Sequence, residues 1–504
     1  MSDALTQWGL TQRDCEVIRG ILAKVAHVDR AVLFGSRAMG MFGRASDIDL
    51  ALEGKNLEWE DILSLRSEFE ESPLPFDVDL VIRAEIVNPE LEKQIKKHGR
   101  MFYEKTSGKY DKKEWKDERF GDLLVGGTRN GIYKSKEFHG RGQKIINMGE
   151  LFAYPRLPAV PMQRIELTDR EQEALSVMPG DLLFARRSLV IEGAGKCSVV
   201  MSIDEPTVFE SSIVRARPNK DKVDSLFLFY YFSSPLGKNK ISSIAREMAV
   251  SGITGTDLAK LVLTLPPLPV QKRIAETLGV LDDKIELNRR MNATLEQIAQ
   301  AIFKSWFVDF EPWGGKRPEG WWEGVLNDIC SYRSDRIAVS SLTPQSYIST
   351  ENMLANKGGF VDAASLPTVS QTTMFQPGDV LVSNIRPYFK KIVFCSFAGG
   401  CSTDVLCFHA RERLLSLYLY YILFNDSFFD YMVAGSKGTK MPRGDKQQIM
   451  NFPVTIPTND VIRDFAAIVE PMMTRITANK NENARLATLR DMLLPKLMNG
   501  EIGV

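Results

Sequence analysis

The chain has 504 residues, 44% of them hydrophobic and 25% charged, which is too long for one hydrophobic core and predicts several globular domains. No apolar run approaches the roughly 18 residues that a membrane-spanning helix requires, so the composition excludes a membrane protein. Acidic and basic residues number 64 each, but residues 1–105 carry 14 basic and 19 acidic side chains, whereas residues 106–504 carry 50 and 45. The longer part is mildly basic, which permits a nucleic-acid partner without requiring one.

The cysteine pattern and the start of the chain predict a reducing compartment. The first ten residues lack the basic segment and apolar core of an export signal, so we expect a cytoplasmic protein. Four histidines and the absence of a CxxC pair give no indication of a zinc site. The cysteines have no paired spacing and are expected to be free thiols: Cys15, Cys197, Cys330, Cys395, Cys401 and Cys407.

A glycine-serine turn follows the first apolar run of the chain. The stretch RAVLFGSRAMG predicts a buried strand over residues 31–34 that runs into this turn and opens a helix. Gly35 allows the backbone to approach a ligand closely, and amides at a helix start favour a phosphate. The next stretch, SDIDLALEG, alternates, so Asp47 and Asp49 are expected on one strand face, where two carboxylates form a site for a hard cation.

A second acidic strand, FDVDLVI, carries Asp77 and Asp79 on one face. A third carboxylate beside the first pair would complete a two-magnesium clamp for phosphoryl or nucleotidyl transfer. The alternation alone leaves both residues as candidates for that third position.

Residues 15–105 resemble the minimal nucleotidyltransferase family, the small polymerase-beta-type domains that include antitoxins which adenylylate a partner. The segment NPELEKQIKKHGRMFYEK is also similar to the closing helix of that family. The resemblance implies a magnesium-dependent enzyme that uses ATP or another nucleoside triphosphate; a retained fold without activity is the alternative. By position, it implies nucleotide binding at Gly35, Ser36 and Arg37, metal binding and catalysis at Asp47, Asp49 and Asp79, and Asp77 as the competing third carboxylate.

An internal repeat governs the rest of the chain. Two helical stretches, one after LPPLPVQKR and one after TIPTNDVIR, align at an offset of 191 residues. Apolar residues recur in each at alternating steps of four and three, which predicts a heptad seam, and two central asparagines would fix its register and partner. Two ordinary amphipathic core helices are the alternative. The predicted seam consists of Ile285, Asn288, Asn292 and Leu295 and their repeat partners Ile476, Asn479, Asn483 and Leu486.

Two broader segments, residues 110–265 and 320–456, precede these helices. Both contain a Pro-Gly-Asp turn that launches an apolar strand, MPGDLLFARR and QPGDVLVSNIRP, and both later carry an aromatic helix, SLFLFYYFSS and SLYLYYILFN. Both also end in a strand bracketed by prolines. The chain therefore consists of two half-units, each a mixed α/β globule followed by a long helix, joined by the connector EPWGGKRPEGWW.

Residues 110–504 resemble the specificity subunit of type I restriction-modification systems, on the helix DDKIELNRRMNATLEQIAQAIFKSWFVDF, the terminal RDMLLPKLMNGEI and the segment RNGIYKSKEFHGRGQKIINMGELF. The resemblance implies two target-recognition domains that each read half of a split site in double-stranded DNA. It also implies that the helices pack antiparallel as a spacer, that two methyltransferase subunits dock on them, and that a restriction or motor subunit joins the complex. The chain has no GxxxxGK[ST], GxGxxG or Asn-Pro-Pro-aromatic motif, so motor and methylation chemistry would belong to other subunits.

Together these features predict a multidomain α+β protein: a small α/β nucleotidyltransferase domain, then two pseudo-repeated mixed α/β target-recognition domains separated by a long antiparallel two-helix coiled coil. A helix over residues 270–308 has 39 positions and spans roughly 58 Å at 1.5 Å per residue, so the two blocks of DNA would be separated by unread base pairs. The expected boundaries are 1–105, 106–266 for the first recognition domain, 267–310 for the first spacer helix, 311–457 and 458–504.

Basic residues in the two globules are candidates for DNA contact, because Arg and Lys read guanine or hold phosphates. A solvated surface charge is the alternative for each of them. The glycine-rich basic stretch SKGTKMPRGDK, residues 436–446, is a further candidate, as a loop that follows phosphates or as a mobile tip. The individual candidates are Arg129, Lys134, Lys136, Arg186, Arg187, Arg386, Lys390 and Lys391.

The leading hypothesis is therefore a DNA-specificity and scaffolding subunit with an appended nucleotidyltransferase-like domain. One alternative is an adenylylating nucleotidyltransferase whose carboxy-terminal part selects the target. The other is an oligomeric scaffold without sequence-specific DNA contact.

Overall fold

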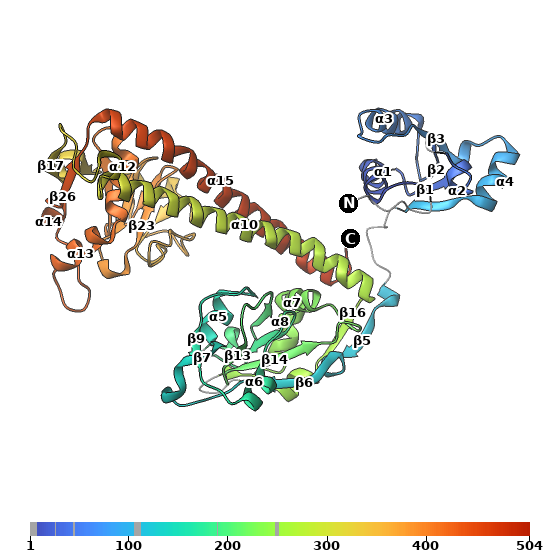
Figure 1. Ribbon diagram of the computed structural model, residues 1–504, viewed down its shortest axis with the longest axis horizontal. Coiled ribbons are helices and arrows are strands. Elements are labelled where there is room, and N and C mark those ends of the chain that lie inside the picture. The colour runs from blue at the N-terminus through green and yellow to red at the C-terminus, as the bar shows by residue number, and fades with distance from the viewer. Residues whose placement is uncertain are drawn as a thin grey trace. The chain divides into compact units, whose positions relative to one another are not determined.

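The computed structural model describes residues 8–25, 27–43, 46–104, 112–188, 190–246 and 251–503. The chain forms two compact units, Met1–Val280 with Arg490–Val504, and Leu281–Leu489 (Figure 1). Each combines helices and sheets, as the α+β prediction requires. None of the helices formed by the described residues is both long and apolar enough to cross a lipid bilayer. All six cysteines are buried and free of disulfide bonds.

The amino-terminal domain is a four-stranded sheet in the order β3-β2-β1-β4, with helices on both faces. Alternation along β1 assigns the faces: Ala31 and Leu33 join a core with α1 and α3, whereas Val32 and Phe34 pack with Ile95 of α4. Strand β2 pairs antiparallel with β1 and parallel with β3. The elements are α1 (Gln12–Lys24), β1 (Arg30–Phe34), α2 (Gly35–Ala38), β2 (Ile48–Glu53), α3 (Trp59–Glu70), β3 (Val78–Ile82), α4 (Pro89–His98) and β4 (Arg100–Glu104).

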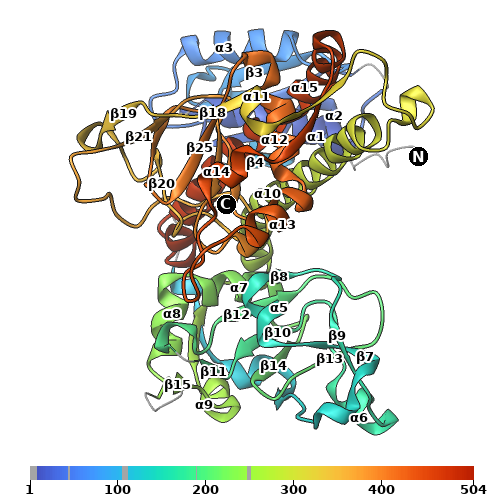
Figure 2. The same cartoon turned by 90° about the vertical axis from the view of Figure 1, so that its left-hand side faces the viewer.

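The first globule, residues 116–265, contains a five-stranded sheet in the order β6-β14-β10-β12-β8. Strands β14, β10, β12 and β8 are labelled in Figure 2. Helix α7 lies against this sheet, and its Phe227, Leu228 and Tyr231 are buried. This explains why α7 is apolar on all sides. The bounds are β5 (Lys116–Arg119), β6 (Leu124–Asn130), β8 (Arg156–Leu157), α6 (Asp169–Leu175), β10 (Leu182–Ala185), β12 (Cys197–Val200), β14 (Ile213–Pro218), α7 (Ser225–Ser233), α8 (Pro235–Ser242), β15 (Ser251–Gly252) and β16 (Val262–Leu265).

The second globule, residues 322–456, repeats this topology. Its main sheet has the order β18-β25-β22-β23, which matches β6-β14-β10-β12 strand for strand. Helix α12 takes the place of α7, with Leu419 and Tyr421 buried against the sheet. The bounds are β17 (Trp322–Val325), β18 (Cys330–Tyr332), β22 (Val380–Ser383), η8 (Pro387–Phe389), β23 (Ile392–Phe394), β25 (Val405–Ala410), α12 (Ser416–Phe424), α13 (Asp426–Ala434) and β26 (Pro453–Ile456).

A two-stranded ribbon closes each globule. In the first, β5 pairs antiparallel with β16, and in the second β17 pairs antiparallel with β26. The strand that ends each globule leads directly into one of the two long helices, α10 (Leu268–Phe307) and α15 (Asn459–Met498). Each helix has 40 residues, or about 60 Å at 1.5 Å per residue.

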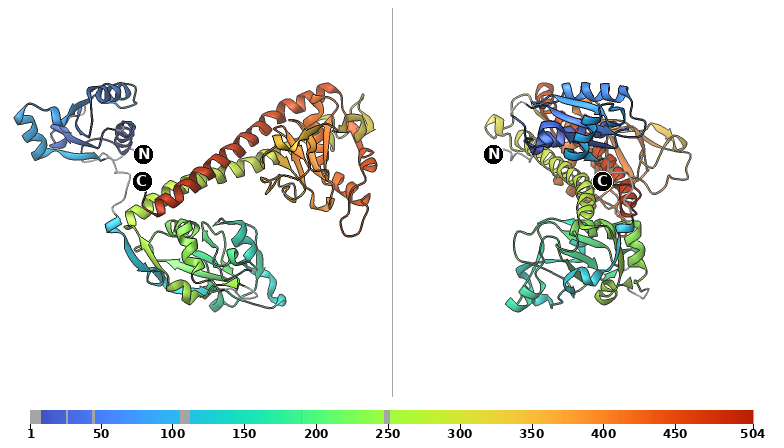
Figure 3. Two further views of the ribbon diagram at one scale, coloured as in Figure 1. Left: turned by 180° about the vertical axis from the view of Figure 1, so that it is seen from behind. Right: turned by 90° about the vertical axis from the view of Figure 1, so that its right-hand side faces the viewer.

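Asparagines join α10 to α15, which lie side by side (Figures 1 and 3). The Nδ2 of Asn288 donates to Oδ1 of Asn483 at 2.9 Å, and the Nδ2 of Asn479 donates to Oδ1 of Asn292 at 2.8 Å. Asn288 and Asn479 are equivalent positions of the 191-residue repeat, and so are Asn292 and Asn483. The helix pair therefore makes one hydrogen bond twice, in antiparallel register about a pseudo-two-fold axis.

The ends of the long helices are packed into globules. In the unit Met1–Val280 with Arg490–Val504, Leu278 of α10 and Leu497 of α15 share a core with α7. In the unit Leu281–Leu489, Phe303 of α10 and Phe465 of α15 share a core with α12. Both globules thus pack against the same pairing of one helix start and one helix end.

We expect Asn288→Ala to lower the thermal stability of the helix pair by about 1–3 kcal/mol, because Asn288 is buried and donates to both Asn483 and Glu482. The midpoint of thermal unfolding, followed by circular dichroism of the full chain, checks this. The repeat-equivalent Asn479→Ala should lower the midpoint similarly. Asn481→Ala, at an exposed position on α15, is the control and should leave it unchanged. Equal midpoints for all variants would contradict the assigned role.

Candidate functional site

The amino-terminal sheet brings four of the expected residues to one end of neighbouring strands. In the strand registers Asp49 lies opposite Asp79 on one side and opposite Phe34 on the other. Gly35 follows Phe34 directly, and Asp47 precedes β2 by one residue. The sheet therefore places the glycine-serine turn beside the acidic ends of β2 and β3.

Among the three carboxylates at this end of the sheet, Asp49 has a shifted pKa. Its pKa is raised above the usual value, chiefly by partial burial and then by the charges of Asp79 and Asp47, while the positive charge of Arg37 opposes the shift. Asp79 lies opposite Asp49 in the strand register, whereas Asp77 precedes β3, and its backbone carbonyl accepts a hydrogen bond from the amide of Ile48. Asp79 is therefore the residue of the second acidic strand that acts on Asp49.

Gly35 is fixed by its contact with Asp49. Its φ is +69°, and an added Cβ would lie 2.1 Å from Oδ2 of Asp49. Any side chain at this position would displace the carboxylate, apart from the strain of the left-handed backbone. The turn thus requires glycine because the acidic strand passes directly against its backbone.

Arg37 differs from its expected part in nucleotide binding. The residue is 1% exposed, and its guanidinium donates to the backbone carbonyls of Ser46, Asp47 and Trp8 and lies 4.3 Å from the ring centre of Phe76. A guanidinium occupied in this way holds the segment before β2 in place and is not offered to a phosphate. The sequence pattern could not reveal this, because it does not fix which way the side chain of a one-turn helix points.

The three carboxylates have the right donor chemistry for Mg²⁺, since hard cations prefer carboxylate oxygens. In the described part of the chain, however, no three Asp, Glu, His or Cys side chains converge into a group that could hold a metal ion. The charges of Asp79 and Asp47 instead help to raise the pKa of Asp49.

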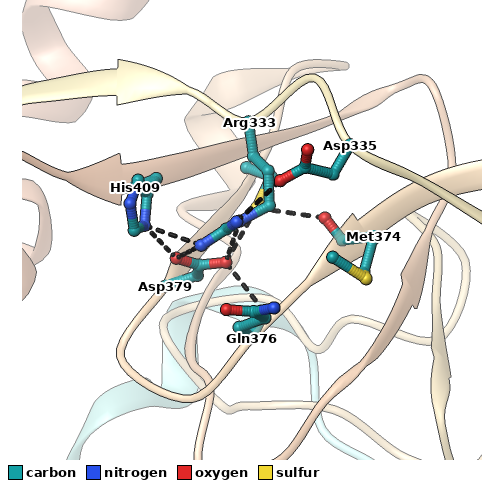
Figure 4. A network of polar contacts seen from close by, with 7 residues as sticks. Arg333, Asp335, Met374, Gln376, Asp379 and His409 are labelled. Atoms are coloured by element: carbon teal, nitrogen blue, oxygen red, sulfur yellow. Dashed lines mark hydrogen bonds and ion pairs between the residues drawn. The ribbon is translucent and has the colours of Figure 1, made fainter.

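Each globule also has a buried polar site at its Pro-Gly-Asp turn. Asp181 and Asp379 are each 1% exposed, and each accepts a hydrogen bond from the backbone amide three residues earlier. In the first globule Asp181 pairs with Arg217 of β14 at 2.7 Å. In the second globule Asp379 pairs with Arg333, which follows β18, at 2.6 Å (Figure 4).

In the two globules, the arginine that pairs with the buried aspartate comes from a different place in the sheet. His409 of β25 occupies the place of Arg217 in β14, and its Nδ1 lies 2.9 Å from Oδ1 of Asp379 (Figure 4). An arginine from the neighbouring strand then compensates the buried charge. The sequence pattern does not reveal these partners, although a carboxylate in a buried turn requires a cation nearby, and that requirement is the signal that points to one.

In each globule the loop after the Pro-Gly-Asp strand pairs with a second loop. That second loop follows α7 and α8 in the first globule, and α12 and α13 in the second. Arg187 and Ser188 pair with β15, and Ile385 pairs with Arg443. The basic stretch 436–446 therefore lies against the loop that carries Arg386. The two loops are more than 40 residues apart in the sequence, so the sequence alone does not show that they are neighbours.

Most of the basic DNA candidates are engaged with the protein itself. Lys134 pairs with Glu171 at 2.7 Å, and this contact, with bonds from Thr168, lowers the pKa of Glu171 to about 2. Lys390 pairs with Asp426. The remaining candidates are placed as follows: Arg129 donates to the carbonyl of Ala174, Arg186 to that of Ser211 and Lys391 to that of Thr350, Arg386 is half-buried, and Lys136 and Arg187 are exposed.

Comparison with known proteins assigns both parts of the chain. Residues 16–107 match the family model described as polymerase beta, nucleotidyltransferase, and residues 112–297 match that of the type I restriction modification DNA specificity domain. A putative type I restriction enzyme MjaX specificity subunit from Methanocaldococcus jannaschii is 38% identical over 78% of this chain and 94% of its own length. The chain belongs to the type I restriction-modification specificity subunits.

Other specificity subunits match with lower identity. The MjaIX specificity subunit of the same organism is 23% identical over 80% of this chain and 96% of its own length. A crystal structure of a type I restriction-modification S subunit from M. genitalium covers 76% of this chain and 96% of that chain, at 15% identity and a TM-score of 0.48. The present chain additionally carries the nucleotidyltransferase domain ahead of its specificity domain.

We expect Gly35→Ala to destabilise the amino-terminal domain by several kcal/mol, because the new Cβ would both strain the backbone and meet the Asp49 carboxylate. Faster hydrogen exchange in β1 and β2 of the full chain would report it. Gly40→Ala is the matched control, since Gly40 has a φ of +74° but open space around its Cβ, so it should cost only about 1–2 kcal/mol. Equal effects of the two variants would refute the contact with Asp49.

Proposed function

We propose that this chain reads a bipartite site in double-stranded DNA and serves as the scaffold on which two methyltransferase subunits and a restriction or motor subunit assemble. The observation that carries the proposal is the duplicated half-unit: two globules of matching strand order, joined to helices that make the same asparagine bond twice.

Two DNA-reading globules joined by one pair of long helices suit a split DNA target. The two globules share a topology but differ in the residues around the turn, so they would read different sequences. Helices of about 60 Å span many base steps of about 3.4 Å, which favours two short blocks with unread DNA between them. Linking two weak readers also multiplies their affinity when the spacing fits.

The pseudo-two-fold axis supports the docking of two methyltransferase copies. A single chain with an internal two-fold repeat offers two similar surfaces, and identical partners bind such surfaces in equivalent ways. The exposed Lys136 and Arg187 are the best placed of the basic candidates for DNA contact, because the others pair with protein groups or are partly buried. Six buried free thiols support a reducing cytoplasm as the site of action.

Genome-wide mapping of methylated bases, with and without this gene, tests the proposed specificity. A split motif with an unread spacer should vanish on deletion and return when the intact gene is restored. A gene lacking residues 1–105 should restore it equally well, because those residues lie outside the duplicated half-units. Methylation that persists in the deletion strain would contradict the proposal.

A second candidate function, nucleotidyl transfer, is favoured by the contact of Gly35 with Asp49 and by the raised pKa of Asp49. Mg²⁺ is commonly bound by one or two carboxylates together with substrate phosphates, so the carboxylates of Asp47, Asp49 and Asp79 would share the ion with the phosphates of ATP. The backbone of Gly35 and Ser36 would accommodate those phosphates. Bound magnesium would supply neutralisation of the phosphate charge. Asp49 needs to be ionised for this role, and a nearby cation would reverse the raised pKa.

Labelled ATP tests this activity. Full-length protein with Mg²⁺ should transfer label to itself or to a partner, and the double variant Asp47→Asn with Asp49→Asn should abolish the transfer. Asp79→Asn should also abolish it, whereas Asp77→Asn, the matched control, should retain it because Asp79, and not Asp77, lies opposite Asp49 in the strand register. Label that survives in the double variant would show that this site is not responsible.

A further inference from the structure

The turn between β22 and β23 presents two adjacent aromatic rings to solvent. This turn, residues 384–391, has Tyr388 at 49% and Phe389 at 39% exposure, with ring centres 4.8 Å apart. Pro387 beside them is buried. The rings therefore form a small apolar tip on a base that belongs to the globule.

The backbone on both sides of the tip is strained. Arg386 has a φ of 49° and Lys390 a φ of 50°, in the left-handed region that ordinary side chains rarely adopt. Asn356 and Lys357 on the neighbouring loop share this conformation. Strain of this kind persists only where the surroundings impose it, and it is concentrated at functional sites.

Hydrogen bonds and ion pairs impose the strain. The amides of Asn356 and Lys357 donate to the carbonyls of Phe389 and Lys390, each at 2.8 Å. The ammonium groups of Lys357 and Lys390 both pair with Asp426, at 2.8 and 2.9 Å. The turn is thus braced from the adjoining loop and from the start of α13, so the rings sit on a rigid support.

Basic side chains lie beside the tip. The turn and the neighbouring stretch 436–446 together contain seven Lys and Arg residues and one acidic residue. Arg443, paired with Ile385 at the backbone, and Lys437 have side chains 58% and 80% exposed, although each also contacts a carboxylate. An apolar tip within a basic rim is complementary to stacked bases inside a rim of phosphates.

The corresponding turn of the first globule lacks such a tip. There the loop after β10 contains Arg187, Ser188 and Val190, and no aromatic residue in its described part. An aromatic tip would therefore contact only the half of the DNA site that the second globule reads.

We propose that Tyr388 and Phe389 form a wedge that enters the DNA groove at the second half-site and partly opens one base step. This inference rests on the proposed DNA-reading function and adds to it a specific contact and a deformation of the DNA. A wedge selects base steps that unstack easily, so it would contribute specificity without a hydrogen bond to a base edge.

The test uses the complex isolated from its host through an affinity tag on the full chain. A duplex library with a randomised core is selected for binding, and the selected duplex is then remade with 2-aminopurine at successive positions. We expect fluorescence to rise at one step within one block of a split motif. Tyr388→Ala with Phe389→Ala should abolish that rise and weaken binding roughly tenfold or more, the scale of one lost aromatic stacking contact.

Ring-conserving and distant variants serve as controls. Tyr388→Phe and Phe389→Tyr should keep both the fluorescence rise and the affinity, because a wedge requires rings and not a hydroxyl group. Trp322→Ala, which removes a half-exposed ring from β17, should change neither. A double variant that binds and fluoresces like the unmodified protein would overturn the wedge while leaving the DNA-reading function intact.

The remaining outcomes are equally decisive. If the double variant loses affinity but the unmodified protein never raises fluorescence, the rings contact DNA without opening a step and the wedge is wrong. If the unmodified complex selects no motif, the proposed DNA-reading function fails and the wedge fails with it.

Discussion

The pairing of Asn288 with Asn483, and of Asn479 with Asn292, is the constraint on which the arrangement of the duplicated part depends. Apolar residues alone would tolerate several registers of two long helices. A buried amide does not, because a slip of one turn would leave it without a partner at a cost of about 1–3 kcal/mol per group. The register in turn decides which helix start meets which helix end in each globule core.

Duplication has preserved the architecture of the globules more strictly than their contacts. Both keep the strand order, the apolar helix and the buried aspartate of the Pro-Gly-Asp turn. The cation beside that aspartate comes from β14 in one globule and from just beyond β18 in the other. The buried charge needs a partner, but the fold does not dictate its source, and this freedom allows neighbouring surface loops to diverge.

The sequence predicted what depends on local pattern. The first long helix was expected over residues 270–308 and occupies 268–307, and the order of acidic strands in the amino-terminal domain was apparent from alternation. Contacts between distant segments could not be predicted in this way. The inward course of Arg37, the pairing of Lys134 with Glu171 and the meeting of two basic loops depend on where folding brings the chain together.

The ribbons that close the globules have a consequence for how such chains change over time. In each globule the first and last strands are hydrogen-bonded neighbours, Lys116 beside Leu265 and Trp322 beside Ile456. The sequence between them begins and ends at nearly one point, so its replacement disturbs a single junction. Genetic exchange at these junctions would replace one entire globule, while the long helices and their asparagines stay as they are.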